Sequence, residues 1–103
     1  MAYESGTFEA SLAVAAGEDF ALLAELRLAY LESASRQLYL LRRSRCDANW
    51  RVAALRLQGI AASFQDHELA SISRDVVTSA PGDPFVLRRV GQHLDKIGGQ
   101  ALI

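Results

Sequence analysis

The sequence predicts an all-α fold: an up-and-down, antiparallel four-helix bundle with a short additional helix at the N-terminus. Turn-forming residues are few and stand where helices would end, and no alternation of apolar and polar residues persists beyond a few positions. Four long helical segments joined by short loops would lie antiparallel to their neighbours. Because 103 residues are too few to divide in two, we expect a single domain, with an N-terminal segment at 1–17 and the bundle at 18–97.

The first two helices are predicted from residues that suit helix ends. Thr7 could cap a short helix that runs to Ala16, where Gly17 suits the left-handed turn after a helix. A long helix is expected from about Glu18 to Arg45, with acidic residues at its positive end. The arginines at its other end could bind phosphate, although they more simply complement the helix dipole. Its buried stripe is expected to contain Phe20, Leu23, Leu31, Ala34, Leu38 and Leu41.

Capping residues predict the last two helices. Asp66 is a suitable N-cap for a fourth helix, which would end before Pro81 and Gly82. Asp83 followed by Pro84 is the strongest start signal in the chain, because proline at the first helical position loses no hydrogen bond. Two consecutive glycines are expected to end the last helix after residue 97. The inward-facing residues of these two helices are expected to be Leu69, Ile72, Val76, Leu87, Val90, Leu94 and Ile97.

The third helix, expected over residues 48–64 with Asp47 as its N-cap, has two distinct faces on a wheel of about 100° per residue. Its core stripe is expected to contain Trp50, Ala53, Leu57, Ile60, Ala61 and Phe64. Leu55 lies roughly 160° from Leu57 and should point to solvent. Glycine inside a helix costs up to about 1 kcal/mol relative to alanine. Gly59, on the same outward arc, therefore favours either a surface that another molecule approaches or close packing of a neighbouring helix.

The segment NWRVAALRLQGIAASFQDHELA, residues 49–70, resembles the active helix of histidine-containing phosphotransfer (HPt) domains. These helical bundles shuttle phosphate between receiver domains in bacterial phosphorelays. Their motif reads H-x-L-K-G, followed by small residues and by an apolar residue five positions after the glycine. Leu57 matches the buried leucine, Gly59 the glycine, residues 60–63 the small stretch and Phe64 the apolar position. The resemblance extends over about residues 19–97.

The departures from the family motif determine what the resemblance implies. Leu55 occupies the position of the phosphorylated histidine, Gln58 that of the lysine, and Gln65 a place where the family usually has glycine. Nucleophilic catalysis requires an atom that can form the covalent intermediate, and leucine has none. We therefore expect no enzymatic activity, but a module that binds a response-regulator receiver domain or a histidine kinase without carrying phosphate. The expected partner-binding residues are Arg51, Leu55, Gln58, Gly59 and Ala62.

Two alternatives stay open. An active phosphotransferase could use another histidine, His67 or His93. The first is expected at a helix start, where the dipole disfavours imidazolium, and the second at the edge of the core. Alternatively, a structural bundle could form a homodimer through its Leu55 face, without a signalling partner.

Composition excludes several other classes of function. Eleven basic and twelve acidic residues leave a net charge of −1, so no overall field would recruit nucleic acid or an anionic membrane. No apolar run approaches the roughly 20 residues that span a bilayer, and the N-terminus lacks the basic region of a secretory leader. We therefore expect a cytoplasmic protein. The single Cys46 can form no internal disulfide, and no His, Cys or acidic spacing predicts a metal site or cofactor.

Overall fold

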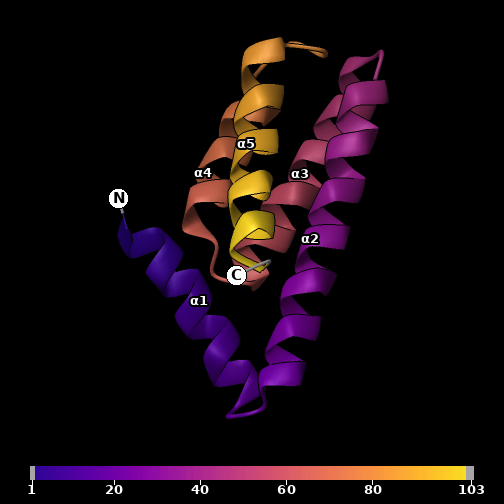
Figure 1. Cartoon of the computed structure of the whole chain (residues 1–103). Helices are drawn as coiled ribbons and strands as arrows, with labels where there is room; N and C mark the ends of the chain where they lie inside the picture. Colours follow the sequence, from indigo (N-terminus) through magenta and orange to yellow (C-terminus); the bar gives the residue numbers. More distant parts are fainter. Residues whose placement is uncertain (1, 102–103) are drawn as a thin grey trace.

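The computed structural model describes the backbone of residues 2–101 and the side chains of residues 8–99. Within that range the chain is all-α, as predicted, and contains no strand (Figure 1). The helices are α1 (Ala2–Ala16), α2 (Phe20–Arg43), α3 (Asp47–Ser63), α4 (His67–Val77) and α5 (Pro84–Ala101). Helices α3 and α5 each contact both α2 and α4, so these four helices close a ring, while α1 contacts α2 and α4. None of the five described helices is long and apolar enough to cross a membrane.

Helix α1 begins earlier than the sequence indicated. Thr7, predicted to be its N-cap, lies inside the helix, because residues 2–6 contain no proline and their backbone is already helical. The predicted end is confirmed: the helix stops at Ala16, and Gly17 adopts a φ of 67°. Phe8 and Leu12 are buried, and the Phe8 ring packs with its centroid 4.8 Å from that of Tyr30 in α2. This packing holds α1 against α2.

Helix α2 is held at its start by Asp19, whose side chain accepts a hydrogen bond from the backbone N–H of Leu22. The expected position of Phe20 in the core is wrong, since its side chain is 84% exposed. In Figure 1 the first turns of α2 extend past the end of α5 and have only α1 beside them. Tyr30, which the predicted stripe left out, is fully buried. The other predicted positions are buried or half-buried: Leu23, Leu31, Ala34, Leu38 and Leu41.

Helix α3 starts at Asp47, so the prediction of this residue as the N-cap is wrong by one position. Cys46 is the N-cap residue, and its side chain makes no capping hydrogen bond. Asp47 places a negative charge in the first turn, where it interacts favourably with the positive end of the helix dipole. The predicted core stripe is confirmed, with Ile60 and Phe64 half-buried and the rest buried: Trp50, Ala53, Leu57 and Ala61.

The turn between α3 and α4 contains a residue in an uncommon conformation. Gln65 has a φ of 62°, in the left-handed region. The N–H of Asp66 bonds to the carbonyl of Ala61 and that of Gln65 to the carbonyl of Ala62, which is the Schellman pattern of a helix end. The turn brings Asp66 into the core at the start of α4, where its Oδ1 accepts the Leu69 N–H at 3.1 Å. The predicted cap of α4 is thus confirmed.

Helix α4 ends at Val77, a few residues before Pro81. Helix α5 begins at Pro84 as predicted, and Asp83 accepts a hydrogen bond from the N–H of Phe85. The predicted end of α5 at the glycine pair is wrong, because both glycines are helical and the helix continues to Ala101. Glycine permits a helix to end but does not force it to. The predicted inward-facing residues of both helices are buried, apart from the half-buried Leu87: Leu69, Ile72, Val76, Val90, Leu94 and Ile97.

Candidate functional site

The outer face of α3 carries the residues that the sequence singled out. Leu55 is 45% exposed, whereas Leu57, two positions later, is completely buried. Three of the other expected partner-binding residues are exposed on the same face, and Gln58 is half-buried. These three are Arg51, Gly59 and Ala62. The helical wheel therefore gives the correct orientation for this helix, and Leu55 is an exposed apolar side chain, with Val52 equally exposed one turn before it.

Gly59 is open to its surroundings. A Cβ atom placed on it would meet nothing within 4 Å, so no neighbouring helix requires a glycine at this position. The close-packing explanation for Gly59 is therefore wrong. Leu55 lies one turn before Gly59 and Ala62 one turn after it. Because Gly59 has no side chain, the surface of α3 between these two residues is smooth.

The two histidines occupy different environments. His67 is the first residue of α4 and is exposed. His93, in α5, is only 5% exposed, which agrees with its expected place at the edge of the core. Its Nε2 lies 2.7 Å from Oδ2 of Asp66, and its Nδ1 lies 3.4 Å from Oε2 of Glu68. The His93 ring thus lies between the carboxylate of Asp66, the N-cap of α4, and that of Glu68 in α4.

Asp66 connects three helices through one buried carboxylate. The Tyr30 hydroxyl of α2 donates to Asp66 Oδ2 at 2.5 Å, and the same oxygen faces His93 of α5. Burial and the nearby carboxylate raise the pKa of Tyr30 above its ordinary value. Burial alone would raise the pKa of Asp66, but the hydrogen bonds from His93 and Tyr30 outweigh it and hold that pKa below its ordinary value.

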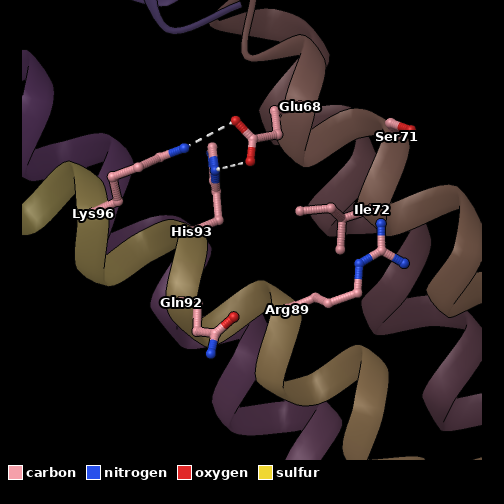
Figure 2. A pocket seen from close by; sticks show the side chains of 7 residues that line it. All are labelled: Glu68, Ser71, Ile72, Arg89, Gln92, His93 and Lys96. Atoms are coloured by element: carbon pink, nitrogen blue, oxygen red, sulfur yellow. Dashed lines mark hydrogen bonds and ion pairs between the residues drawn. The ribbon is translucent and has the colours of Figure 1, made fainter. Parts of the chain in front are cut away.

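Glu68 and Lys96 extend this network toward solvent. Figure 2 shows Lys96 and His93, both from α5, pointing toward Glu68 of α4, with 3.0 Å between Lys96 Nζ and Glu68 Oε1. Burial would raise the pKa of Glu68, but Lys96 and His93 together lower it. An open cavity of about 390 Å³ adjoins these residues, and Arg89 at its edge pairs with Asp75 at 2.9 Å. Because these charges are already paired, we interpret the network as a structural link between helices.

The sequence did not predict this network. The sequence predicted Asp66 as an N-cap and His93 at the edge of the core. Nothing in the sequence indicated that these two side chains contact each other. Tyr30 and His93 lie 36 and 27 residues from Asp66 in the chain, so only the packing of the helices brings them together. An N-cap uses one oxygen of the Asp66 carboxylate, and because the structure buries this residue its second oxygen also requires a partner.

Neither a metal site nor a known relative indicates the function. Among the residues that the structure describes, no group of three or more His, Cys, Asp or Glu could hold a metal ion. Comparisons of the chain with protein-family models, with curated proteins and with solved structures find no match. The function is therefore inferred from the chain's own residues.

Proposed function

We propose that this chain is a phosphotransfer-like signalling module that binds a response-regulator receiver domain or a histidine kinase without carrying phosphate. In this proposal α2 to α5 form an up-and-down antiparallel four-helix bundle similar to an HPt domain of a bacterial phosphorelay, with α1 added to it. One observation carries the proposal. Leu55, at the position of the phosphoacceptor histidine, is exposed one turn before Gly59, which has open space around it.

The surface around Leu55 suits docking. Removal of an exposed leucine from water by a partner lowers the free energy of the complex. The glycine and alanine that follow Leu55 on this face leave the surface flat. Arg51 lies one turn before Leu55 and supplies positive charge on the same face. A patch of this size would bury a small interface, typical of transient signalling complexes. We therefore expect an affinity in the micromolar range.

The same face lacks what phosphate transfer requires. Leu55 has no nucleophilic atom, and Gln58 can donate a hydrogen bond to an anion but cannot neutralise its charge. His93 is buried, with its Nε2 against Asp66 and its Nδ1 shielded from solvent, so neither ring nitrogen stands at the surface. His67 is exposed, but it stands at the positive end of α4. These placements favour a binding role over catalysis.

A phosphotransfer assay tests the proposal. The protein is incubated with phosphorylated receiver domains from its own genome, and acid-labile phosphate on the chain is followed over time. We expect receiver or kinase binding without labelling of the wild-type chain. Labelling that disappears in His67→Ala or His93→Gln would establish an active phosphotransferase instead. The double variant Leu55→His, Gln58→Lys is the positive control, because it restores the nucleophile and the charge at the family's positions.

A further inference from the structure

A groove runs between α2 and α3, beside the Leu55 face. It consists of two adjoining cavities of about 440 and 480 Å³ that share Arg56. We call the two together the α2–α3 groove. Its α2 wall contains Ser33, Gln37, Leu40, Arg43 and the C-cap residue Ser44. Its α3 wall contains Asn49, Val52, Ala53, Arg56, Gly59, Ile60, Ser63 and the C-cap residue Phe64.

The charge of the α2–α3 groove is entirely positive. Arg43 and Arg56 are its only charged residues, and they stand on opposite walls. Neither forms an ion pair with any side chain of residues 8–99. Arg43 instead lies over the ring of Tyr39, 5.4 Å from its centroid. The chain as a whole is slightly acidic, so this local charge is a property of the groove.

Apart from the two arginines, the groove is lined by five polar residues, by Gly59 and by apolar residues on both walls. Leu40 and Val52 are 38% and 45% exposed, one on each wall. Gln37 is 9% exposed, and its Oε1 has no hydrogen-bond partner among the described residues. Nearly all buried polar atoms in proteins have a partner, so this oxygen is an exception in the wall of the groove.

We propose that the α2–α3 groove binds an acidic amphipathic helix of a partner protein. A groove between two packed helices accepts the ridge of a third helix, and the exposed Leu40 and Val52 on its two walls match an apolar stripe. Arginines on opposite walls match acidic side chains on both sides of that stripe. Gly59 lets the incoming backbone approach α3 closely at one end. This inference does not require the partner to be a receiver domain or a kinase, so it stands independently of the proposed function.

Two synthetic peptides of about five helical turns test the inference with the full chain. Both are fluorescein-labelled and carry a leucine stripe, flanked by glutamates in one peptide and by lysines in the other. We expect the glutamate peptide to bind, measured by fluorescence anisotropy, and the lysine peptide not to bind. Added salt should weaken the binding. Amide chemical shifts should change along the groove.

Charge-reversal variants locate the site. Arg43→Glu combined with Arg56→Glu should weaken binding of the glutamate peptide by about tenfold or more. The milder Arg56→Gln should give a smaller loss in the same direction, and circular dichroism checks that each variant is folded. Arg88→Glu is the matched control, since Arg88 is exposed on α5 and has no ion pair among the described side chains.

Several results would overturn the inference. The first two are absence of glutamate-peptide binding at the highest soluble concentration and equal binding of both peptides. The other two are an equal loss of binding in Arg88→Glu and chemical-shift changes confined to another surface. A change of oligomeric state on charge reversal would instead assign the groove to contacts between copies of this chain. Receiver binding that is lost in Leu55→Asp but kept in the arginine variants would leave the proposed function intact.

Discussion

At the scale of single residues, Leu55 and Leu57 make a matched pair on one helix. Leu57 is completely buried in the core, so Leu57→Ala should lower the free energy of unfolding by about 2–5 kcal/mol. Leu55 faces solvent, and Leu55→Ala should change that free energy by less than about 0.5 kcal/mol. Urea denaturation measures both. Similar large losses in the two variants would mean that the outer face of α3 is covered.

Gln65 provides a second prediction at this scale. Its left-handed φ of 62° costs an L-residue about 1–2 kcal/mol, whereas glycine adopts it freely. Glycine also makes the unfolded chain more flexible, which offsets part of the gain. We expect Gln65→Gly to raise the free energy of unfolding by up to about 1 kcal/mol. Thermal denaturation measures the change, and a lower melting temperature would contradict the turn geometry.

The orientation of a residue follows from the sequence only where the neighbours extend along the whole helix. On α3 the wheel separates Leu55 from Leu57 correctly because α2 and α4 both contact this helix. On α2 the same reasoning fails for Phe20, since periodicity cannot indicate how far α5 reaches along α2. The wheel places Gly59 outward, but only the structure shows that no neighbouring helix packs against it.

At the scale of elements, helix starts were predicted correctly where a capping residue stood next to a proline or a turn. Asp83 precedes a proline and Asp66 follows a turn, and both cap helices. Thr7 has no proline before it, and the helix already starts at Ala2, so the capping ability of Thr7 is not used there. The glycines at 98 and 99 failed as an end signal for a related reason. A helix ends where its backbone turns away, and glycine alone does not impose that turn.

The link between α2, α4 and α5 predicts how stability depends on pH. The pKa of Asp66 is lower in the folded chain than in the unfolded chain. Its charged form therefore stabilises the fold above about pH 4, the ordinary aspartate value, and this contribution is lost as pH falls through the folded pKa. The free energy of unfolding should decrease as the solution is acidified below about pH 4.

Asp66→Asn isolates this contribution. The variant should be less stable than the wild type at pH 7, because it removes the charged partner of His93 and Tyr30. The difference should shrink at pH 3, where the wild-type carboxyl is closer to protonation. Glu68→Gln is the control, since the Glu68 side chain is 36% exposed and its effect should be smaller. A stability difference for Asp66→Asn that is independent of pH would contradict the assignment.

At the scale of the whole molecule, the all-α class was predictable because turn-forming residues are few and the apolar residues recur at helical spacing. Short loops also predict the contacts between consecutive helices from α2 to α5, whereas the contact of α2 with α5 required the structure. The Asp66 network and the α2–α3 groove were not predictable. Both depend on which side chains face each other across helices, and their spacing along the chain carries no information about that.

The oligomeric state tests the structural alternative at this scale. If the Leu55 face serves a different protein, the chain should be monomeric at micromolar concentrations in light scattering. Leu55→Asp should then leave the mass unchanged. A stable dimer that becomes monomeric in Leu55→Asp would show that this face joins two copies of the chain.

The measurement that tests the central claim most directly compares partner binding by two leucine variants. Leu55 and Leu28 are 45% and 57% exposed, but Leu28 lies on α2, outside the expected partner-binding residues. For receiver domains and histidine kinases of the same genome, calorimetry should show that Leu55→Asp weakens binding by about tenfold or more. Leu28→Asp should leave it unchanged. Equal effects of the two variants, or no binding of any receiver or kinase by the wild type, would contradict the claim.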